Sequence, residues 1–375
     1  MREFRHYFSD IHFSDYHRTA YLPTQIGSRI KAVNWEHDTW DETDVVILGC
    51  GEQRGAGQRA TSFAPDAIRQ QLYPLHYWHD QVRIADAGNL LLGESIEDSY
   101  SSLSTVMQEL LKEGKKIIIL GGSHDLTLAQ YRAYQGLKQL VDVAVIDSLI
   151  DLKEEEEVTD QGFLMEMLTG RSNFIRHFTH IGFQSYLVDP TILQTLDRLR
   201  FDCIRLGLVK EKIELVEPDL RSVHMLSIDM MAMKYADAPY LRNGSPNGLL
   251  NNELCELTKF AAMNDDLNSI GFYGYLPEND QDDIGAKAIA QSIWYLLDGW
   301  YAQSMEADMN DEAAYEVHHV IFAETQTVFK KSKRTGRWWM QMPSGNFIPC
   351  SYEDYVAAAS DDLPERWLRN NERII

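Results

Sequence analysis

The sequence predicts an α/β protein with a mostly parallel sheet that is covered by helices on both faces. Short runs such as "DVVILGC" (44–50) and "KKIIILGG" (115–122) are apolar at successive positions, which is typical of strands buried on both faces. Segments with a helical spacing of apolar residues alternate with these runs along the chain. The 375 residues are 44% hydrophobic, which is enough to bury a sizeable core.

In the first half of the chain, strands and helices alternate in order. The first strand, 44–50, runs into a glycine-rich loop, and a helix is expected at 65–73 because Pro65 is favourable in a first helical turn. A second helix is expected at 99–114, where apolar residues recur at helical spacing until Gly114 ends it. The next elements are a strand at 115–122, a helix at 126–137 and a strand at 142–147.

The second half continues the alternation of strands and helices until the sequence pattern changes near residue 307. Strands are expected at 178–183, 201–206, 223–229 and 268–275, and helices at 253–263 and 284–301. The segment 317–343 predicts two strands around a Lys-Arg-Thr-Gly turn. One or two short helices follow, the first with a capping box formed by Ser351 and Asp354. We therefore divide the chain into a main domain, 1–306 (core about 40–305), and an appended C-terminal segment, 307–375, that is too small to fold as an independent domain.

The composition excludes several classes of partner and location. The formal net charge of −22 repels phosphate backbones and anionic membrane surfaces, so neither nucleic acid nor a membrane is an expected partner. No apolar run approaches the ~20 residues of a membrane-spanning helix, and the first residues lack the apolar centre of a signal peptide. The four cysteines are scattered without CxxC spacing. These features favour a cytoplasmic protein.

Three predicted strand ends carry residues of the types that bind metals. "GGSHD" (121–125), "DSLID" (147–151) and "SIDMM" (227–231) each follow or end a strand of the expected parallel sheet. Ligand sites in such sheets form beyond the carboxyl ends of the strands. One histidine and several aspartates at this edge would make a nitrogen and oxygen site for a divalent cation such as Mn²⁺. Taken singly, each motif is more often explained by loop and helix-capping residues, and the order and spacing of all three together favour the metal site.

The order of these motifs resembles the ureohydrolase superfamily, which comprises arginase, agmatinase and formimidoylglutamase. The superfamily motifs GGxH, DAHxD and SxDxD stand here as "GGSHD", "DSLID" and "SIDMM". The resemblance covers roughly residues 40–305 and implies a three-layer α/β/α sandwich. It also implies a dinuclear manganese cluster whose bridging hydroxide attacks a guanidinium, amidinium or formimino carbon.

Carried onto this sequence, the resemblance implies an incomplete metal cluster. The expected ligands of one metal are His124, Asp147, Asp151 and Asp229. The positions that serve the second metal and the substrate's cationic group have become Leu149, Met231 and Gly274. The resemblance therefore implies at most one divalent cation, Mn²⁺ or none. The loop after Asp151 offers only His177 as a proton-shuttle histidine, and no catalytic residue is assigned.

Three functions stay open from the sequence. The first is a ureohydrolase homologue that has lost dinuclear hydrolysis and acts by binding a ligand or a protein. The second is an active C–N hydrolase of the formimidoylglutamase or arginase type that uses one metal. The third is a structural or assembly protein that acts through its C-terminal segment.

The C-terminal segment holds a basic and aromatic patch in an otherwise acidic chain. Its members are Lys330, Lys331, Lys333, Arg334, Arg337, Trp338 and Trp339. One interpretation is a docking surface for a protein partner or for a second copy of the chain, with the tryptophans as anchors. The other is a hairpin whose charges discourage aggregation and whose tryptophans rest on the main domain.

Overall fold

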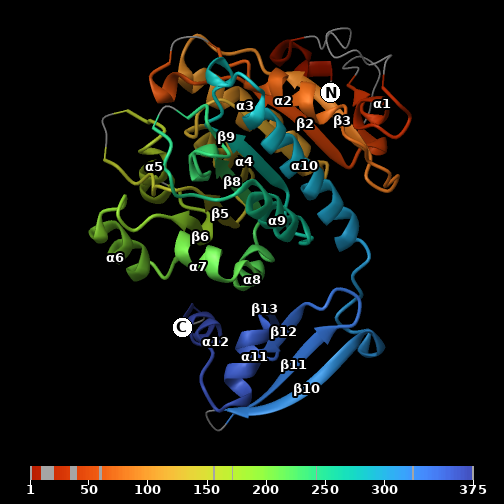
Figure 1. Ribbon diagram of the computed structural model, residues 1–375, viewed down its shortest axis with the longest axis vertical. Coiled ribbons are helices and arrows are strands. Elements are labelled where there is room, and N and C mark those ends of the chain that lie inside the picture. Colours follow the sequence, from red (N-terminus) through yellow and green to blue (C-terminus); the bar gives the residue numbers. More distant parts are fainter. Residues whose placement is uncertain are drawn as a thin grey trace.

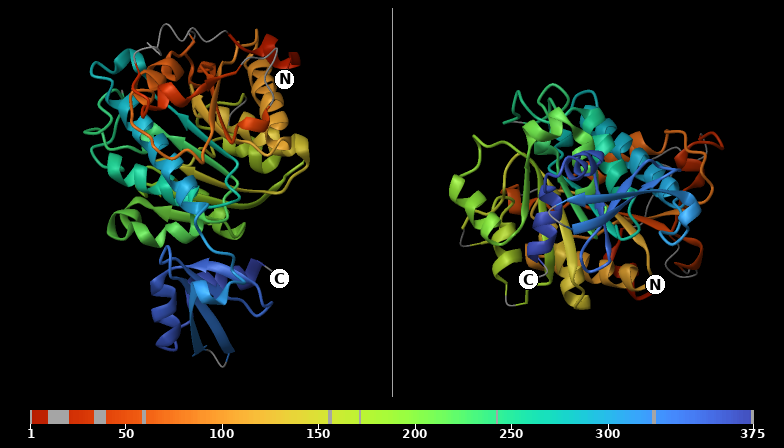
Figure 2. Two further views of the ribbon diagram at one scale, coloured as in Figure 1. Left: turned by 90° about the vertical axis from the view of Figure 1, so that its right-hand side faces the viewer. Right: turned by 90° about the horizontal axis from the view of Figure 1, so that it is seen from below.

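The computed structural model describes residues 2–9, 21–33, 40–58, 61–154, 157–170, 172–241, 243–322 and 325–373. Within these ranges the chain forms a large body and, after helix α10 (Ile284–Gln303), a smaller C-terminal lobe (Figure 1). The left view of Figure 2 shows the lobe below the body, at the end opposite the N-terminus.

A parallel sheet forms the centre of the large body. Among the described residues it has nine strands, in the order β1-β3-β2-β4-β9-β8-β5-β6-β7, and every neighbouring pair is parallel. The strands are β1 (Lys31–Ala32), β2 (Val45–Cys50), β3 (Ile84–Asn89), β4 (Lys116–Gly121), β5 (Val141–Ile146), β6 (Ile175–Phe183), β7 (Asp202–Arg205), β8 (Met225–Asp229) and β9 (Ser269–Tyr273). Strands β4, β9, β8 and β5 lie in the middle, so their carboxyl ends meet at one place.

Helices cover both faces of this sheet, as predicted. Alternate side chains of one strand enter different cores: Ile118 of β4 belongs to one buried cluster and Ile119 to the other. The first cluster packs against α2, α9 and α10, and the second packs against α3 and α4. The helices of the body, besides α10, are α1 (Ile26–Arg29), α2 (Ala64–Leu72), α3 (Ile96–Lys112), α4 (Leu126–Leu137), α5 (Phe163–Thr169), α6 (Pro190–Arg198), α7 (Leu206–Glu211), α8 (Glu217–Leu220) and α9 (Asn251–Ala262). The three-layer α/β/α prediction is confirmed.

The alternation of strands and helices is confirmed, but the prediction missed β3. This strand carries Asp86 in its middle, and the residue is fully buried. Arg69 donates to both carboxylate oxygens of Asp86, at 2.8 and 2.9 Å, and the Tyr73 hydroxyl donates to one of them at 2.6 Å. A buried charge that is paired in this way interrupts the apolar run by which strands are recognised.

The C-terminal lobe contains more strands than the sequence predicted. Its antiparallel sheet has the order β10-β11-β12-β13. The lobe's elements are β10 (Tyr315–Phe322), β11 (Thr325–Ser332), β12 (Trp338–Gln341), β13 (Phe347–Cys350), α11 (Tyr352–Ala359) and α12 (Glu365–Arg373). The predicted strands on either side of the Lys-Arg-Thr-Gly turn are confirmed as β11 and β12, but the segment 317–343 also holds most of β10, which pairs antiparallel with β11. No glycine or proline lies between β10 and β11 to mark where one strand ends and the next begins.

The lobe has its own small core, and its division from the main domain at residue 306 stays a prediction. Phe322, Phe329, Met340 and Cys350 are buried together in it. The capping box at α11 is present: Ser351 Oγ accepts from Asp354 N–H at 3.1 Å, and Asp354 Oδ2 accepts from Ser351 N–H at 2.7 Å.

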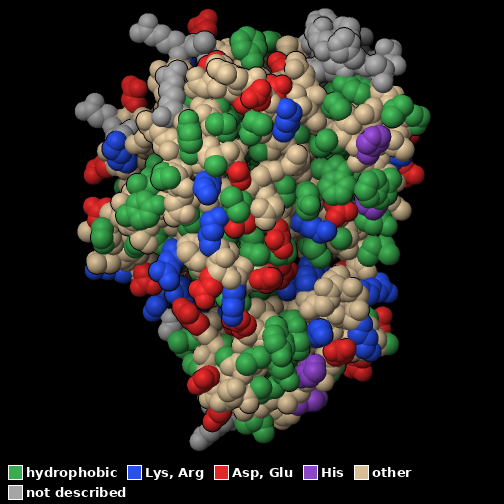
Figure 3. Space-filling view, in the orientation of Figure 1, with side chains coloured by type: hydrophobic (Ala, Val, Ile, Leu, Met, Phe, Trp, Pro, Cys, Tyr) green, Lys and Arg blue, Asp and Glu red, His purple; other side chains and the backbone are tan. Residues whose placement is uncertain are grey.

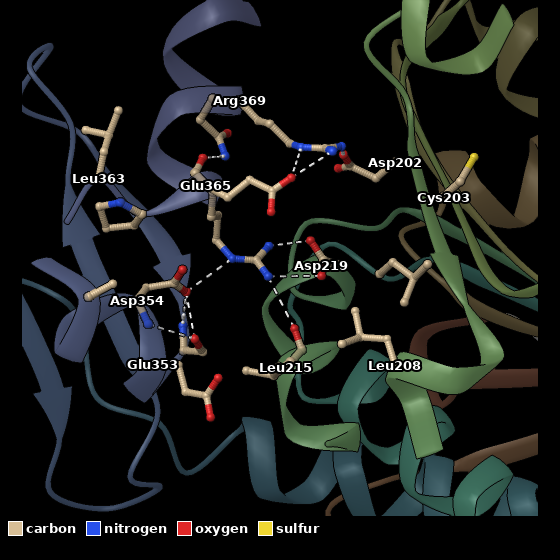
Figure 4. A pocket seen from close by; sticks show the side chains of 16 residues that line it. Asp202, Cys203, Leu208, Leu215, Asp219, Glu353, Asp354, Leu363, Glu365 and Arg369 are labelled. Atoms are coloured by element: carbon tan, nitrogen blue, oxygen red, sulfur yellow. Dashed lines mark hydrogen bonds and ion pairs between the residues drawn. The ribbon is translucent and has the colours of Figure 1, made fainter. Parts of the chain in front are cut away.

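Ion pairs hold the lobe against the body. Arg366 of α12 pairs with Asp219 of α8, donates to the Leu215 carbonyl at 3.2 Å and lies 3.4 Å from Asp354 (Figure 4). Arg369 pairs with Asp202 of β7 at 2.7 Å. Lys and Arg side chains mix with Asp and Glu along this seam between body and lobe (Figure 3).

In the part of the chain that the structure describes, no helix combines the length and the apolar character needed to cross a bilayer.

Candidate metal centre

Four side chains from three strand ends meet at the carboxyl edge of the sheet. His124 follows β4, Asp147 and Asp151 follow β5, and Asp229 ends β8. The His124 Nδ1 atom lies 2.9 Å from Asp151 Oδ2, 3.4 Å from Asp229 Oδ2 and 3.8 Å from Asp147 Oδ2. The structure thus brings together the four residues that the sequence singled out.

The donor atoms are close enough to share one cation. One ligand atom from each of His124, Asp147 and Asp229 lies within 4.8 Å of the other two, and all three residues are buried. Asp151, the fourth residue expected from the resemblance, lies beside this group, with its Oδ2 atom 2.9 Å from His124 Nδ1. One imidazole and three carboxylates suit Mn²⁺ or a similar cation, so the residues present fit a single divalent metal.

A hydrogen bond at Nε2, the ring nitrogen that faces away from the carboxylates, fixes the orientation of the His124 ring. Its Nε2 atom lies 3.0 Å from the Ser227 hydroxyl, which in turn lies 2.6 Å from the Thr127 hydroxyl. A proton on Nε2 that is donated to Ser227 leaves the Nδ1 lone pair directed at the carboxylates. Metal-binding histidines are held by this kind of hydrogen bond on their other nitrogen.

Two of the carboxylates have one oxygen committed to the backbone. Ser148 N–H donates to Asp147 Oδ1 at 2.5 Å, and Met231 N–H donates to Asp229 Oδ1 at 2.8 Å. The remaining oxygen of each, Oδ2, faces His124. Each aspartate therefore presents one oxygen to the centre.

Burial and mutual repulsion disfavour the ionised form of the clustered carboxyl groups, and a bound cation would stabilise it. Burial, together with the charge of Asp151, raises the pKa of Asp147 well above its usual range. Burial and the charge of Asp229 do the same to the pKa of Asp151. Burial, with Asp147 beside it, raises the pKa of Asp229 to about 7. Without a cation, some of these carboxyl groups must hold protons.

A cavity of about 260 Å³ opens onto the cluster. Besides the four candidate ligands, its wall includes Leu149, Met231 and Gly274. Side chains with amide, carboxylate or hydroxyl groups also line it, namely Gln53, Gln58, Asp160, Gln161, Asn243 and Tyr275. The centre is therefore open to a small ligand.

A family model described as the arginase family matches residues 43–298, which include all four candidate ligands. The chain belongs to the arginase family. Curated relatives agree with this. A formimidoylglutamase of Staphylococcus haemolyticus (strain JCSC1435) is 23% identical over 287 residues, covering 72% of this chain and 91% of that protein. One of Geobacillus kaustophilus (strain HTA426) is 27% identical over 213 residues, covering 53% and 65%.

Solved structures of the arginase family share the fold of the large body. The formimidoylglutamase from Bacillus subtilis subsp. subtilis str. 168 superposes with a TM-score of 0.65 at 20% identity, covering 72% of this chain and 91% of that one. Trypanosoma cruzi formiminoglutamase with Mn²⁺₂ gives a TM-score of 0.66 at 18% identity, covering 74% and 98%. At these identities the likeness establishes the fold.

Leu149, Met231 and Gly274, the positions at which the resemblance implies a lost ligand or substrate group, all line the cavity. Leu149 and Met231 are half-buried in the cavity wall, where neither supplies a lone pair that a hard cation prefers. Gly274 follows β9 with a φ of +76°, and its N–H donates to the Gly122 carbonyl at 2.8 Å. A β-carbon at this residue would lie 2.1 Å from Asp229 Oδ1, so the backbone here excludes any side chain.

The cavity also contains residues that the sequence analysis did not select. Gln53 and Gln58 come from the glycine-rich loop after β2, to which the sequence analysis assigned no site residue. Asp160 and Gln161 come from the loop after Asp151, and Asn243 from the loop after β8. Only their position in the sequence could have indicated these cavity residues, since each follows a strand that ends at the same edge of the sheet.

His177 is not part of the centre. It pairs in register with Asp142 near the start of β5, whereas the candidate ligands follow the end of that strand. Its Nε2 atom lies 3.0 Å from Asp202 Oδ2. His177, to which the sequence analysis assigned no catalytic role, therefore lies away from the cluster.

The basic patch of the C-terminal segment is largely used within the chain. Arg221 of the body donates to the Trp338 carbonyl at 2.7 Å, and its guanidinium lies 4.6 Å from the centre of the Trp339 ring. Arg337 pairs with Glu306 at 2.9 Å and donates to the Met263 carbonyl. Trp338 is only 8% exposed. These contacts join the lobe to the body, and the interpretation of the two tryptophans as anchors for a partner stays a prediction.

The four other basic residues of the patch also make contacts inside the lobe or to the segment before it. Lys330 donates to the Met309 carbonyl at 3.0 Å, and Lys333 donates to the Ala313 carbonyl at 2.8 Å. Lys331 lies 3.7 Å from Glu316, and Arg334 donates to the Met305 carbonyl at 2.8 Å. These contacts favour the hairpin interpretation for this part of the segment.

Proposed function

We propose that this arginase-family chain binds one divalent cation, Mn²⁺ by its ligand chemistry, through His124, Asp147, Asp151 and Asp229. We also propose that it has lost dinuclear hydrolysis and acts by binding a ligand at this centre. The observation that carries the proposal is that Leu149 and Met231 line the cavity where the family resemblance places ligands of a second metal.

The chemistry of the side chains supports a binding function. When bound, a divalent cation would neutralise the clustered carboxylates and polarise an oxygen of a ligand or of water. Asp147 and Asp229 each offer one oxygen, because the other accepts a backbone N–H. Gln53, Gln161 and Asn243 present amide groups to the same cavity, and such groups orient a polar ligand by hydrogen bonds.

A second candidate is a single-metal hydrolase of the formimidoylglutamase type. The open cavity favours it, because an accessible ligand site persists beside the four candidate metal ligands. Asp160 also lines the cavity, in the loop after Asp151, and supplies a carboxylate at a place other than residue 274.

Hydrolysis assays of the purified, manganese-loaded chain distinguish the two candidates. Formamide, urea or ammonia release would be measured with formiminoglutamate, arginine and agmatine as substrates. A curated formimidoylglutamase serves as the positive control, and His124→Ala serves as the matched negative control. We expect no turnover above that of the His124→Ala variant. Turnover above roughly 1 s⁻¹, the lower end of ordinary enzymes, would make the hydrolase the correct account.

A further inference from the structure

The free edge of the C-terminal sheet is strand β10, which lacks the residues by which exposed edge strands usually avoid pairing with another strand. Strand β10 (Tyr315–Phe322) is the last strand in the sheet order, and no described strand or isolated bridge pairs with its outer edge. It pairs with β11 over its eight residues without a register shift, and it contains no proline or lysine. Exposed edges usually carry such features because an unpaired strand recruits another one.

The opposite edge of the same sheet is protected. Strand β13 has four residues, includes Pro349 and lies against α8 of the body. Figure 1 shows β13 nearest the body and β10 farthest from it. A partner that adds to β10 would therefore meet no obstruction from the chain's own large body.

The backbone groups that face outward on β10 can be assigned. Lys333 N–H donates to the Ala314 carbonyl at 3.0 Å, and Ser332 N–H donates away from β10, to Arg337. Because hydrogen-bonded and non-bonded residues alternate in an antiparallel pair, Glu316, His318 and Val320 direct their backbone groups at β11. Val317, His319 and Ile321 direct theirs outward.

All three of these residues have exposed side chains, as does Glu316 beside them. Val317 is 43% exposed and Ile321 is 71% exposed, and His319 is exposed between them. The neighbouring Val320 and Phe322 are buried in the lobe's core. Outward hydrogen-bonding groups and an exposed apolar pair thus coincide on one edge.

The sequence of β10 on either side of His319 allows two copies of the strand to pair with each other. In an antiparallel pair of two β10 strands centred on His319, Val317 of each copy lies opposite Ile321 of the other. His319 then lies opposite His319, and each of these three pairs exchanges two backbone hydrogen bonds. Glu316 falls opposite Phe322, so no like charges face each other across the pair. A two-fold axis through His319 satisfies both copies at once.

We propose that the chain forms a two-fold symmetric dimer in which the β10 strands of two copies pair antiparallel about His319. The two four-stranded sheets would join into one continuous sheet, with the large bodies and their metal centres at opposite ends. The contact area is a single strand pair, so the dimer is a weak one that depends on concentration.

Charge placed on the two-fold axis tests this dimer. His319→Lys and His319→Glu each set like charges opposite each other in a homodimer, whereas an equimolar mixture sets opposite charges together. Sedimentation of the full chain over a concentration series should show dimers for the unchanged protein. Each variant alone should dissociate about fivefold more readily, and the mixture should recover dimers.

Matched changes on the adjacent strand complete the test. Gln326 is exposed and lies opposite Ile321 on β11, one strand in from the edge. Gln326→Lys and Gln326→Glu should leave dimerisation unchanged. A wild-type chain that stays monomeric, or a mixture of the His319 variants that does not recover dimers, would overturn the proposal. Capture of another protein's strand by a monomeric chain would overturn it in the same way.

Discussion

A β-carbon on Gly274 would lie 2.1 Å from Oδ1 of Asp229. The carboxylate is held in that position because its Oδ1 accepts the Met231 N–H at 2.8 Å. The backbone at Gly274 therefore lies directly against a candidate metal ligand. This contact leaves no room for a side chain at residue 274.

Substitution of Gly274 should damage the centre and not repair it. Gly274→Ala introduces a side chain at a φ of +76° and into contact with Asp229, so we expect a loss of roughly 1–3 kcal/mol in unfolding free energy and weaker metal binding. Denaturant unfolding and manganese titration measure the two effects. Gly336→Ala is the matched control, since Gly336 has a φ of +74° with nothing within 4 Å of its β-carbon position. Equal metal affinity in the two variants would contradict the assigned contact.

The hydroxyl behind His124 should govern metal affinity. Ser227→Ala removes the partner of Nε2, so the ring loses its fixed orientation and manganese binding should weaken about 10- to 100-fold. Isothermal titration with manganese measures the change. Ser269→Ala, a buried hydroxyl that contacts Gln130 and Tyr134, should keep the original affinity. Equal weakening in both variants would indicate a general loss of packing.

The metal-free protein should lose stability as the pH rises. The pKa of Asp229 is raised to about 7 by burial and by Asp147, so the folded state binds this proton more tightly than the unfolded state does. This contribution is fully present below the ordinary pKa of an aspartate, near 4, and is lost as the pH rises through about 7. Chemical unfolding with chelator present should show a loss of roughly 2 kcal/mol between about pH 5 and pH 8.

Manganese should reverse this loss at the higher pH, and Asp229→Asn should flatten the profile. If the stability of the metal-free chain increased over this pH range, the three buried carboxyl groups could not have raised pKa values.

The seam between body and lobe should depend on Arg366. Its side chain is 19% exposed and contacts Asp219, Asp354 and a carbonyl, so Arg366→Ala leaves two carboxylates without their cation. We expect destabilisation of lobe docking by roughly 3 kcal/mol, seen as faster hydrogen exchange in α12 and β13. Arg369→Ala is the milder comparison, because that side chain is 43% exposed and its ion pairs are largely in water. Equal exchange in the two variants would show that Arg366 does not hold the seam.

Apolar runs predicted most strands of the sheet, strand-end motifs placed polar residues at its edge, and the resemblance to the ureohydrolase superfamily selected the four candidate ligands among them. The parallel strands that carry His124, Asp147 and Asp229 are buried on both faces, and their carboxyl ends necessarily meet. Strand β3 was missed because Asp86 is neutralised by Arg69, a pairing that is visible only in three dimensions. The cavity amides, such as Gln53 and Asn243, lie on loops whose course is set by long-range packing and not by local pattern.

The backbone at Gly274 and the edge of β10 illustrate the same limit. The sequence predicted only that a carboxylate is missing at residue 274, whereas the structure adds that its φ and the nearby Asp229 exclude one. The sequence analysis did not resolve β10 as a strand separate from β11. β10 forms the free edge of the sheet, because β11 pairs with β10 on one side and with β12 on the other.

The number of metal ions per chain tests the single-metal centre most directly. Elemental analysis of manganese-saturated protein, with anomalous scattering to locate the ions, should give one ion at His124, Asp147, Asp151 and Asp229. The double variant Leu149→His with Met231→Asp returns nitrogen and oxygen donors to the cavity wall, and its stoichiometry should rise toward two. Two ions in the unchanged chain would contradict the account, because Leu149 and Met231 would then not have replaced a metal site.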